Sequence, residues 1–186
     1  MEEINMFLDE AQEMMDKSVR HLNAELSKIR AGKASPSMLD GIQVDYYGTP
    51  TPLNQVASVT TPDARSIFIK PWEKKVISDI ERAIINSDLG LNPQNDGEQV
   101  IINIPVLTEE RRQVLVKQAR HEGEQARISV RNARKEINDA LKQLQKEGAS
   151  EDDVKRAEEK VQEITDVHNK KIDEILVKKE SEIMTV

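Results

Sequence analysis

The 186-residue sequence contains no cysteine. This absence excludes disulfide bonds, thiolate metal sites and catalytic thiols, and it is consistent with a reducing compartment. No apolar run approaches the roughly 20 residues that are needed to cross a bilayer. The start, Met1-Glu2-Glu3, lacks the basic and apolar parts of a signal peptide and is too acidic for a mitochondrial transit peptide. We therefore expect a cytoplasmic protein that does not associate with membranes.

Patterns typical of catalysis and metal binding are also missing. The three histidines, His21, His121 and His168, belong to different predicted helices, form no His-Glu-x-x-His motif, and are expected on the surface or in a helix seam. No glycine-rich phosphate loop is present. Residues 92–97 resemble part of a calcium loop, but the twelfth position falls on Asn103 instead of a bidentate glutamate. The sequence therefore predicts a protein that is not an enzyme and that needs no metal or other cofactor.

Charge and helical periodicity are abundant. Charged residues make up 33% of the chain and hydrophobic residues 37%. The longest periodic stretch runs from Thr108, a residue suited to an N-cap, to Lys146, with Gly148 as a suitable C′ residue. Its expected heptad seam consists of Leu115, Ala119, Gly123, Ala126, Val130, Ala133, Ile137, Ala140 and Leu144. Glycine within a helix costs about 1 kcal/mol relative to alanine, so Gly123 indicates a closely approaching helix.

Two further helices are predicted. The first thirty residues carry a seam of Ile4, Leu8, Ala11, Met15, Val19, Leu22, Leu26 and Ile29. The last carries Val154, Ala157, Val161, Ile164, either Val167 or His168, Ile172 and Ile175, after Ser150 in a variant of the capping box. Because each helix has one apolar face, the three should bury their seams in an elongated three-helix bundle formed by residues 1–30 and 106–186.

Residues 31–105 have a different composition. They contain all seven prolines and four of the five aromatic residues. Short β-rich runs at 42–46, 56–60, 65–70 and 99–104 and a helix at 74–86 predict a small β/α/β domain inserted between the first two helices, hence an α+β protein. The segment 48–52 is expected to interrupt the first strand. Two chain crossings at 30–32 and 104–106, with Ala31, Gly32, Ile104 and Pro105, suggest a hinge.

A basic stripe lies beside the seam of the long helix, formed by Lys117, Arg120, Arg127, Arg131 and Arg134. Residues 108–135 contain eight Lys or Arg and four Glu, whereas the whole chain has a net charge of −7. Two interpretations remain open. The stripe is either a solvated face with a partner such as Glu124, or a surface for a polyanion, and arginine suits phosphate. No DNA-reading motif is present, which favours folded RNA over DNA.

Long runs of the sequence are similar to one known family. They include residues 28–30 (Lys-Ile-Arg), 34–37 (Ala-Ser-Pro-Ser), 39–42 (Leu-Asp-Gly-Ile), 46–53 (Tyr-Tyr-Gly-Thr-Pro-Thr-Pro-Leu), 87–93 (Ser-Asp-Leu-Gly-Leu-Asn-Pro), 107–112 (Leu-Thr-Glu-Glu-Arg-Arg), 124–127 (Glu-Gln-Ala-Arg), 130–132 (Val-Arg-Asn) and 150–153 (Ser-Glu-Asp-Asp). By these runs the chain resembles the ribosome recycling factor family over essentially its whole length.

The resemblance implies an L-shaped protein of tRNA-like dimensions, in which a three-helix bundle carries a hinged β/α/β domain. It implies binding across the A and P sites of the post-termination ribosome. With elongation factor G and GTP, such a protein splits the ribosome into subunits and releases mRNA and tRNA, after which initiation factor 3 keeps the subunits apart. The family has no active site.

The resemblance also implies contacts to large-subunit ribosomal RNA by Arg30, Arg127 and Arg131, with Arg131 the leading candidate. Lys33 occupies a position where the family usually has arginine, Ala31 one where threonine is common, and Lys135 lies in a run that differs from the family pattern. These lysines keep the charge and lose the bidentate fork of arginine. The alternative function is a coiled-coil adaptor that recruits a protein through its seams. A stable monomer, which we expect, would argue against it.

Overall fold

The computed structural model describes residues 2–185, so Met1 and Val186, the outer ends of the predicted bundle segments, lie outside the described residues. The chain divides into two compact units. The first is formed by the chain up to Ala31 and from Glu109 onward, and the second by Gly32–Thr108. Long helices make up the first unit and strands with short helices the second, which confirms the α+β class. None of the helices described is long and apolar enough to span a membrane.

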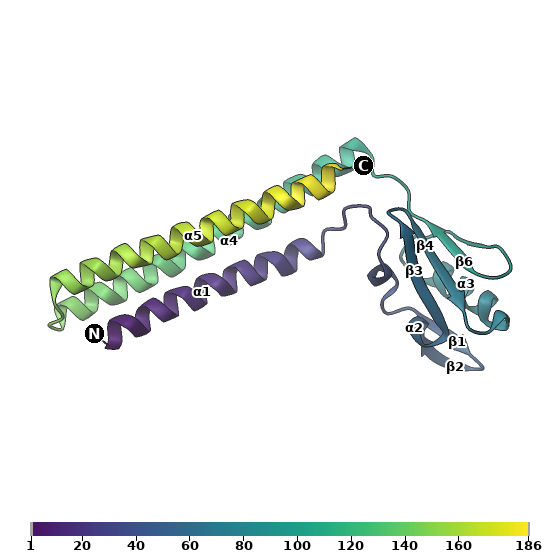
Figure 1. Ribbon diagram of the computed structural model, residues 1–186, viewed down its shortest axis with the longest axis horizontal. Coiled ribbons are helices and arrows are strands. Elements are labelled where there is room, and N and C mark those ends of the chain that lie inside the picture. The colour runs from purple at the N-terminus through teal and green to yellow at the C-terminus, as the bar shows by residue number, and fades with distance from the viewer. Residues whose placement is uncertain (1, 186) are drawn as a thin grey trace. The chain divides into compact units, whose positions relative to one another are not determined.

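Three long helices lie side by side in the first unit: α1 (Glu2–Ser27), α4 (Glu109–Lys146) and α5 (Glu151–Met184). Every pair of them is in contact. A tight turn joins α4 to α5 at the end of the bundle where α1 begins, so α4 runs antiparallel to the other two (Figure 1). Gly148 adopts a φ of 112° in this turn, a conformation that favours glycine.

The buried seams follow the true helical period and drift away from a strict heptad. The structure buries Ser18, Leu141, Thr165 and Leu176, whereas their predicted neighbours Val19, Ala140, Ile164 and Ile175 stay partly exposed. An α-helix has 3.6 residues per turn, so a pattern of 3.5 drifts by about 20° per heptad. The prediction of three one-sided helices is confirmed, but these seam positions were wrong, and the open choice between Val167 and His168 falls on His168.

Gly123 lies where α4 meets α5. A Cβ atom on this residue would lie 2.3 Å from Leu176 Cδ1, so a larger residue would force the Leu176 side chain to shift. This close approach of α5 agrees with the prediction from the position of Gly123 in the seam. The predicted capping box at Ser150 was wrong. The Ser150 side chain makes no capping hydrogen bond, and its carbonyl accepts the first helical bond from Val154. Three acids, Glu151, Asp152 and Asp153, instead complement the positive end of α5.

The second unit contains a hairpin and a separate sheet. The hairpin pairs β1 (Gln43–Tyr46) with β2 (Thr49–Pro52), so the segment expected to interrupt a strand forms one after a two-residue turn. Prolines are tolerated there because β2 is an edge strand. The sheet is antiparallel in the order β3-β4-β6-β5, made of β3 (Ala57–Asp63), β4 (Ser66–Pro71), β5 (Pro93–Asn95) and β6 (Val100–Asn103).

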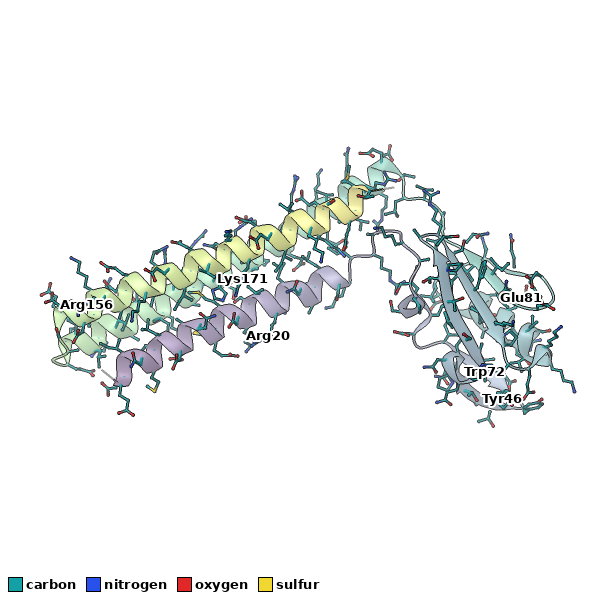
Figure 2. All side chains as sticks on the ribbon, in the orientation of Figure 1. Arg20, Tyr46, Trp72, Glu81, Arg156 and Lys171 are labelled. Atoms are coloured by element: carbon teal, nitrogen blue, oxygen red, sulfur yellow. The ribbon has the colours of Figure 1, made fainter. Side chains whose placement is uncertain are left out.

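Helices α2 (Leu53–Val56) and α3 (Ile77–Asn86), with 3₁₀ turns at Pro36–Leu39 and Lys74–Val76, complete this unit. Its core is rich in β-branched residues: Val44, Ile67, Ile69, Ile80, Ile84, Val100 and Ile102 are fully buried. Alternation along β4 and a spacing of three and four along α3 direct these side chains into one core. Tyr46 and Trp72 lie toward the hairpin end of the unit (Figure 2).

Candidate nucleic-acid interface

The predicted basic stripe lies on one flank of α4, beside the surface of this helix that packs against α5. Lys117, Arg120 and Arg131 are exposed, and Arg127 and Arg134 are half-buried. With 3.6 residues per turn, Arg120, Arg127 and Arg134 lie closest to the buried seam, and Lys117 and Arg131 lie further round the helix toward solvent. The stripe therefore consists of three arginines close to α5 and two cations that face solvent.

Arg120 is held by a carboxylate of α5. Its Nε donates to Glu180 Oε1 at 2.7 Å and its Nη2 to Oε2 at 3.2 Å, which is a bidentate arrangement. The hydrogen bond from Arg120 lowers the pKa of the Glu180 carboxyl below its usual value, and the same bond raises the pKa of Arg120. Glu180 is therefore ionised at neutral pH and neutralises this arginine.

Arg127 and Arg134 also have partners. Arg127 Nη2 donates to Asp173 Oδ1 at 2.5 Å, and Nη1 donates to Glu124 on its own helix. Arg134 Nη1 donates to Gln162 Oε1 at 3.1 Å. We refer to Arg120, Arg127 and Arg134 as the paired arginines. The expected partner Glu124 is confirmed, but most of the pairing comes from α5.

Three cations on the outer side of the same helix differ from the paired arginines. Lys117, Arg131 and Lys135 are exposed, and none has a hydrogen-bond or ion-pair partner within residues 2–185. We refer to them as the outer cations. Their charges are neutralised only by solvent and counterions, so these three cations are available to bind an anion. Lys142 and Lys146, nearer the end of α4, are exposed in the same way.

The α5 partners were missed because they are distant in the sequence. Residues 120 and 180 pair across the bundle, and so do residues 127 and 173. A step of seven residues forward on α4 matches a step of seven backward on α5, as antiparallel packing requires. The matching spacing of Asp173 and Glu180 is a signal that is recognisable only once the register of the two helices is known.

The remaining predicted contacts lie outside α4. Arg30 is exposed beyond the end of α1 in the first unit, and Lys33 is exposed in the second unit. The structure therefore brings together the five residues of the stripe and leaves these two on other segments.

Of the four predicted hinge residues, Ala31 and Gly32 flank the first boundary between the units, whereas Ile104 and Pro105 lie within the second unit. Ala31 ends the first segment of the bundle, and Gly32 begins the second unit with a φ of 72°. A Cβ on Gly32 would lie 2.7 Å from Leu107 Cγ, so the two crossing segments touch. Ile104 is buried in the second unit's core and donates its N–H to the Arg65 carbonyl at 2.7 Å, and the second boundary follows Thr108.

Histidine and acidic side chains provide no metal site within the described part of the chain, because no three of them are grouped to hold an ion. His21 and His121 are exposed, and His168 is fully buried. His168 Nε2 lies 2.8 Å from Asp16 Oδ1, and Nδ1 lies 2.7 Å from the Ile164 carbonyl oxygen. The ring thus joins α5 to α1 in the bundle core.

Comparison with known proteins identifies one family. The model of the family described as ribosome recycling factor matches residues 22–184. Ribosome-recycling factors are similar over the full length of both chains, with 59% identity for the protein of Amoebophilus asiaticus and 56% for that of Cytophaga hutchinsonii.

Solved structures agree with this result. A solution structure of a ribosome recycling factor has a TM-score of 0.73 and 36% identity, with all of both chains covered. A second structure contains the T. thermophilus ribosome recycling factor with E. coli elongation factor G on the E. coli post-termination complex. It has a TM-score of 0.60 and 45% identity over 98% of this chain and 99% of that one. This chain belongs to the ribosome recycling factor family.

Proposed function

We propose that this protein binds the post-termination ribosome and, with elongation factor G and GTP, splits it into subunits and releases mRNA and tRNA. The proposal is supported by 59% identity to a ribosome-recycling factor over the whole of both chains. It is further supported by the similar structure in which such a factor and elongation factor G are bound to a post-termination complex. The protein itself is not an enzyme, since GTP is hydrolysed by elongation factor G.

The outer cations of α4 are the proposed anchor on large-subunit ribosomal RNA. Arg131 carries this assignment, because it is exposed and no side chain in the described chain neutralises it. Its guanidinium has five N–H donors for phosphate oxygens. Lys117 and Lys135 add charge along the same side of the helix, and Arg30 and Lys33 add contacts from other segments.

Binding to purified large ribosomal subunits across a salt series tests the anchor. Arg131→Ala should weaken binding by roughly tenfold and reduce the salt slope by about one, because one phosphate contact is lost. Arg20→Ala is a matched control, since Arg20 is an exposed arginine of α1 that pairs with Glu13. Wild-type binding that does not depend on salt would exclude a phosphate anchor.

The splitting step is proposed to be mechanical. The bundle stays on ribosomal RNA while elongation factor G moves the second unit about the crossings at 31–32 and 105–108, and initiation factor 3 then keeps the subunits apart. We assign the hinge at the first crossing to Gly32. Its positive φ and its proximity to Leu107 exclude a larger residue without local rearrangement. Gly32→Ala should preserve subunit binding and slow splitting in the presence of elongation factor G and GTP. Unchanged splitting would remove Gly32 from the mechanism.

The coiled-coil adaptor is the weaker candidate. The seams that would recruit a partner are buried among α1, α4 and α5 of a single chain. We therefore propose a cytoplasmic monomer, and sedimentation analysis that found a stable dimer at micromolar concentration would return the adaptor to consideration.

A further inference from the structure

We infer that Glu180 and Asp173 of α5 compete with RNA phosphates for Arg120 and Arg127, and that these two acids limit the affinity of the basic face. The inference rests on the proposed function, because it concerns the same RNA-binding surface. It assigns to the two acids a role in tuning affinity that is separate from the anchoring role of Arg131.

The pairs are accessible from solvent. The Arg120 side chain is 64% exposed and Glu180 28%, while Arg127 is 31% exposed and Asp173 60%. Exposed ion pairs contribute little to stability, so they exchange partners readily. Each guanidinium can therefore leave its carboxylate without disturbing the bundle core, which is formed by the apolar seam residues and includes neither pair.

The competition follows from the geometry of the guanidinium. Arg120 uses Nε and Nη2 to bind both oxygens of Glu180, and the same edge binds two oxygens of a phosphate. One edge cannot serve both anions at once. A phosphate that approaches the paired arginine also meets the negative charge of the carboxylate, which repels it.

The arrangement separates two classes of cation on one helix. The outer cations can bind phosphate without breaking an ion pair. Arg120 and Arg127 can contribute to phosphate binding only after an acid of α5 is displaced. Arg127 is held by Glu124 as well as by Asp173, but Arg120 has Glu180 as its one ion-pair partner among residues 2–185. Glu180 is therefore the position where the competition is most directly measurable.

The test is Glu180→Gln in the full-length protein, measured on purified large ribosomal subunits across a salt series. Without the competing charge, binding should tighten by roughly two- to fivefold, which corresponds to the strength of one exposed ion pair. The salt slope should become steeper by about one, because one more arginine contacts phosphate. Glu174→Gln, an exposed acid of α5 that forms no ion pair within the described chain, is the control for the change in net charge.

Coupling to the arginine provides a second readout. In the wild type, Arg120→Ala should change the affinity for large subunits by less than about twofold, because Glu180 neutralises the charge of Arg120. In the Glu180→Gln background, the same substitution should remove the whole gain in affinity. Thermal melting should be the same for all variants, because the pair is exposed.

Three results would overturn the inference. Equal effects of Glu180→Gln and Glu174→Gln would mean that the gain in affinity comes from the change in net charge alone. Weaker binding of Glu180→Gln would mean that the acid orients Arg120 toward RNA. Independent effects of the two substitutions would show no competition. Failure of the proposed function looks different, since wild-type protein would then bind subunits without salt dependence and Arg131→Ala would change nothing.

Discussion

The bundle buries three polar side chains, Ser18, Thr165 and His168, whereas the buried residues described in the second unit are all apolar. The difference follows from how each unit fixes its register. In the sheet, backbone hydrogen bonds between β4 and β6 align the strands residue by residue. Helices satisfy their backbone internally, so only side chains align one helix with another.

Two of these three polar residues, Ser18 and His168, make contacts between different helices. Ser18 Oγ of α1 lies 2.7 Å from Ser129 Oγ of α4, and His168 of α5 is hydrogen-bonded to Asp16 of α1. A sliding of α1 along its neighbours would break both contacts, whereas an apolar seam with many small residues would tolerate it. Polar groups at core positions thus specify the alignment of helices.

The largest expected effect is in the second unit. Ile80→Ala removes a fully buried side chain of α3 and should lower the free energy of unfolding of this unit by about 2–5 kcal/mol. Hydrogen exchange of the backbone amides of β4 and β6 reports the unfolding of this unit, while circular dichroism follows the helices. Ile85→Ala, at a 61% exposed position of the same helix, should have almost no effect. If both signals gave the same loss in the free energy of unfolding, the two units would unfold as one.

A smaller effect is expected for Asp16→Ala in the bundle. The substitution leaves His168 Nε2 buried without its acceptor, which costs about 1–3 kcal/mol. Asp9→Ala, at an exposed position of α1, is the control and should cost far less. A neutral outcome for Asp16→Ala would show that the bundle does not depend on this contact.

The same carboxyl makes the bundle sensitive to acid. The hydrogen bond from His168 lowers the pKa of Asp16 below its ordinary value of 3.8, and Gln12 and Lys171 act in the same direction. The stabilisation by Asp16 is therefore fully present above pH 3.8 and is lost as the pH falls through the lower pKa of the folded state. Unfolding curves of wild type and Asp16→Ala should converge in this acidic range, and a constant difference would contradict the assignment.

The smallest effect is expected at the two tyrosines of the second unit, the half-buried Tyr46 and the exposed Tyr47. Both hydroxyls donate to Glu73, Tyr46 at 2.8 Å and Tyr47 at 2.7 Å, and these bonds raise the pKa of each phenol above 10.0. Any stabilisation by these bonds is present below pH 10 and is lost as the pH rises through the raised pKa. The chain has no other tyrosine, so tyrosinate absorbance reports this site alone.

Glu73→Gln removes the charge and should return the tyrosinate titration toward pH 10. Glu81→Gln, at a half-buried position of α3 that lies away from Tyr46, serves as the control (Figure 2). A titration that is unchanged by Glu73→Gln would show that the carboxylate does not hold the two hydroxyls in solution.

The helices are predictable from the sequence because their signals are local. Apolar spacing, the absence of proline and the glycine at 148 define α4 and the turn after it, and the matching runs of residues identify the family. The same local patterns assigned a strand break to 48–52, where the structure forms an edge strand, because pairing with β1 is a tertiary contact.

The candidate site was also predictable only in part. Helical spacing alone placed five cations on one flank of α4, since that depends on the period of a single helix. The charge that remains available depends on the register of α4 against α5, which brings Glu180 to Arg120 and Asp173 to Arg127 and leaves Arg131 unpaired in the described chain. Packing between helices fixes that register through contacts such as Gly123 against Leu176, and these join residues that are far apart in the sequence.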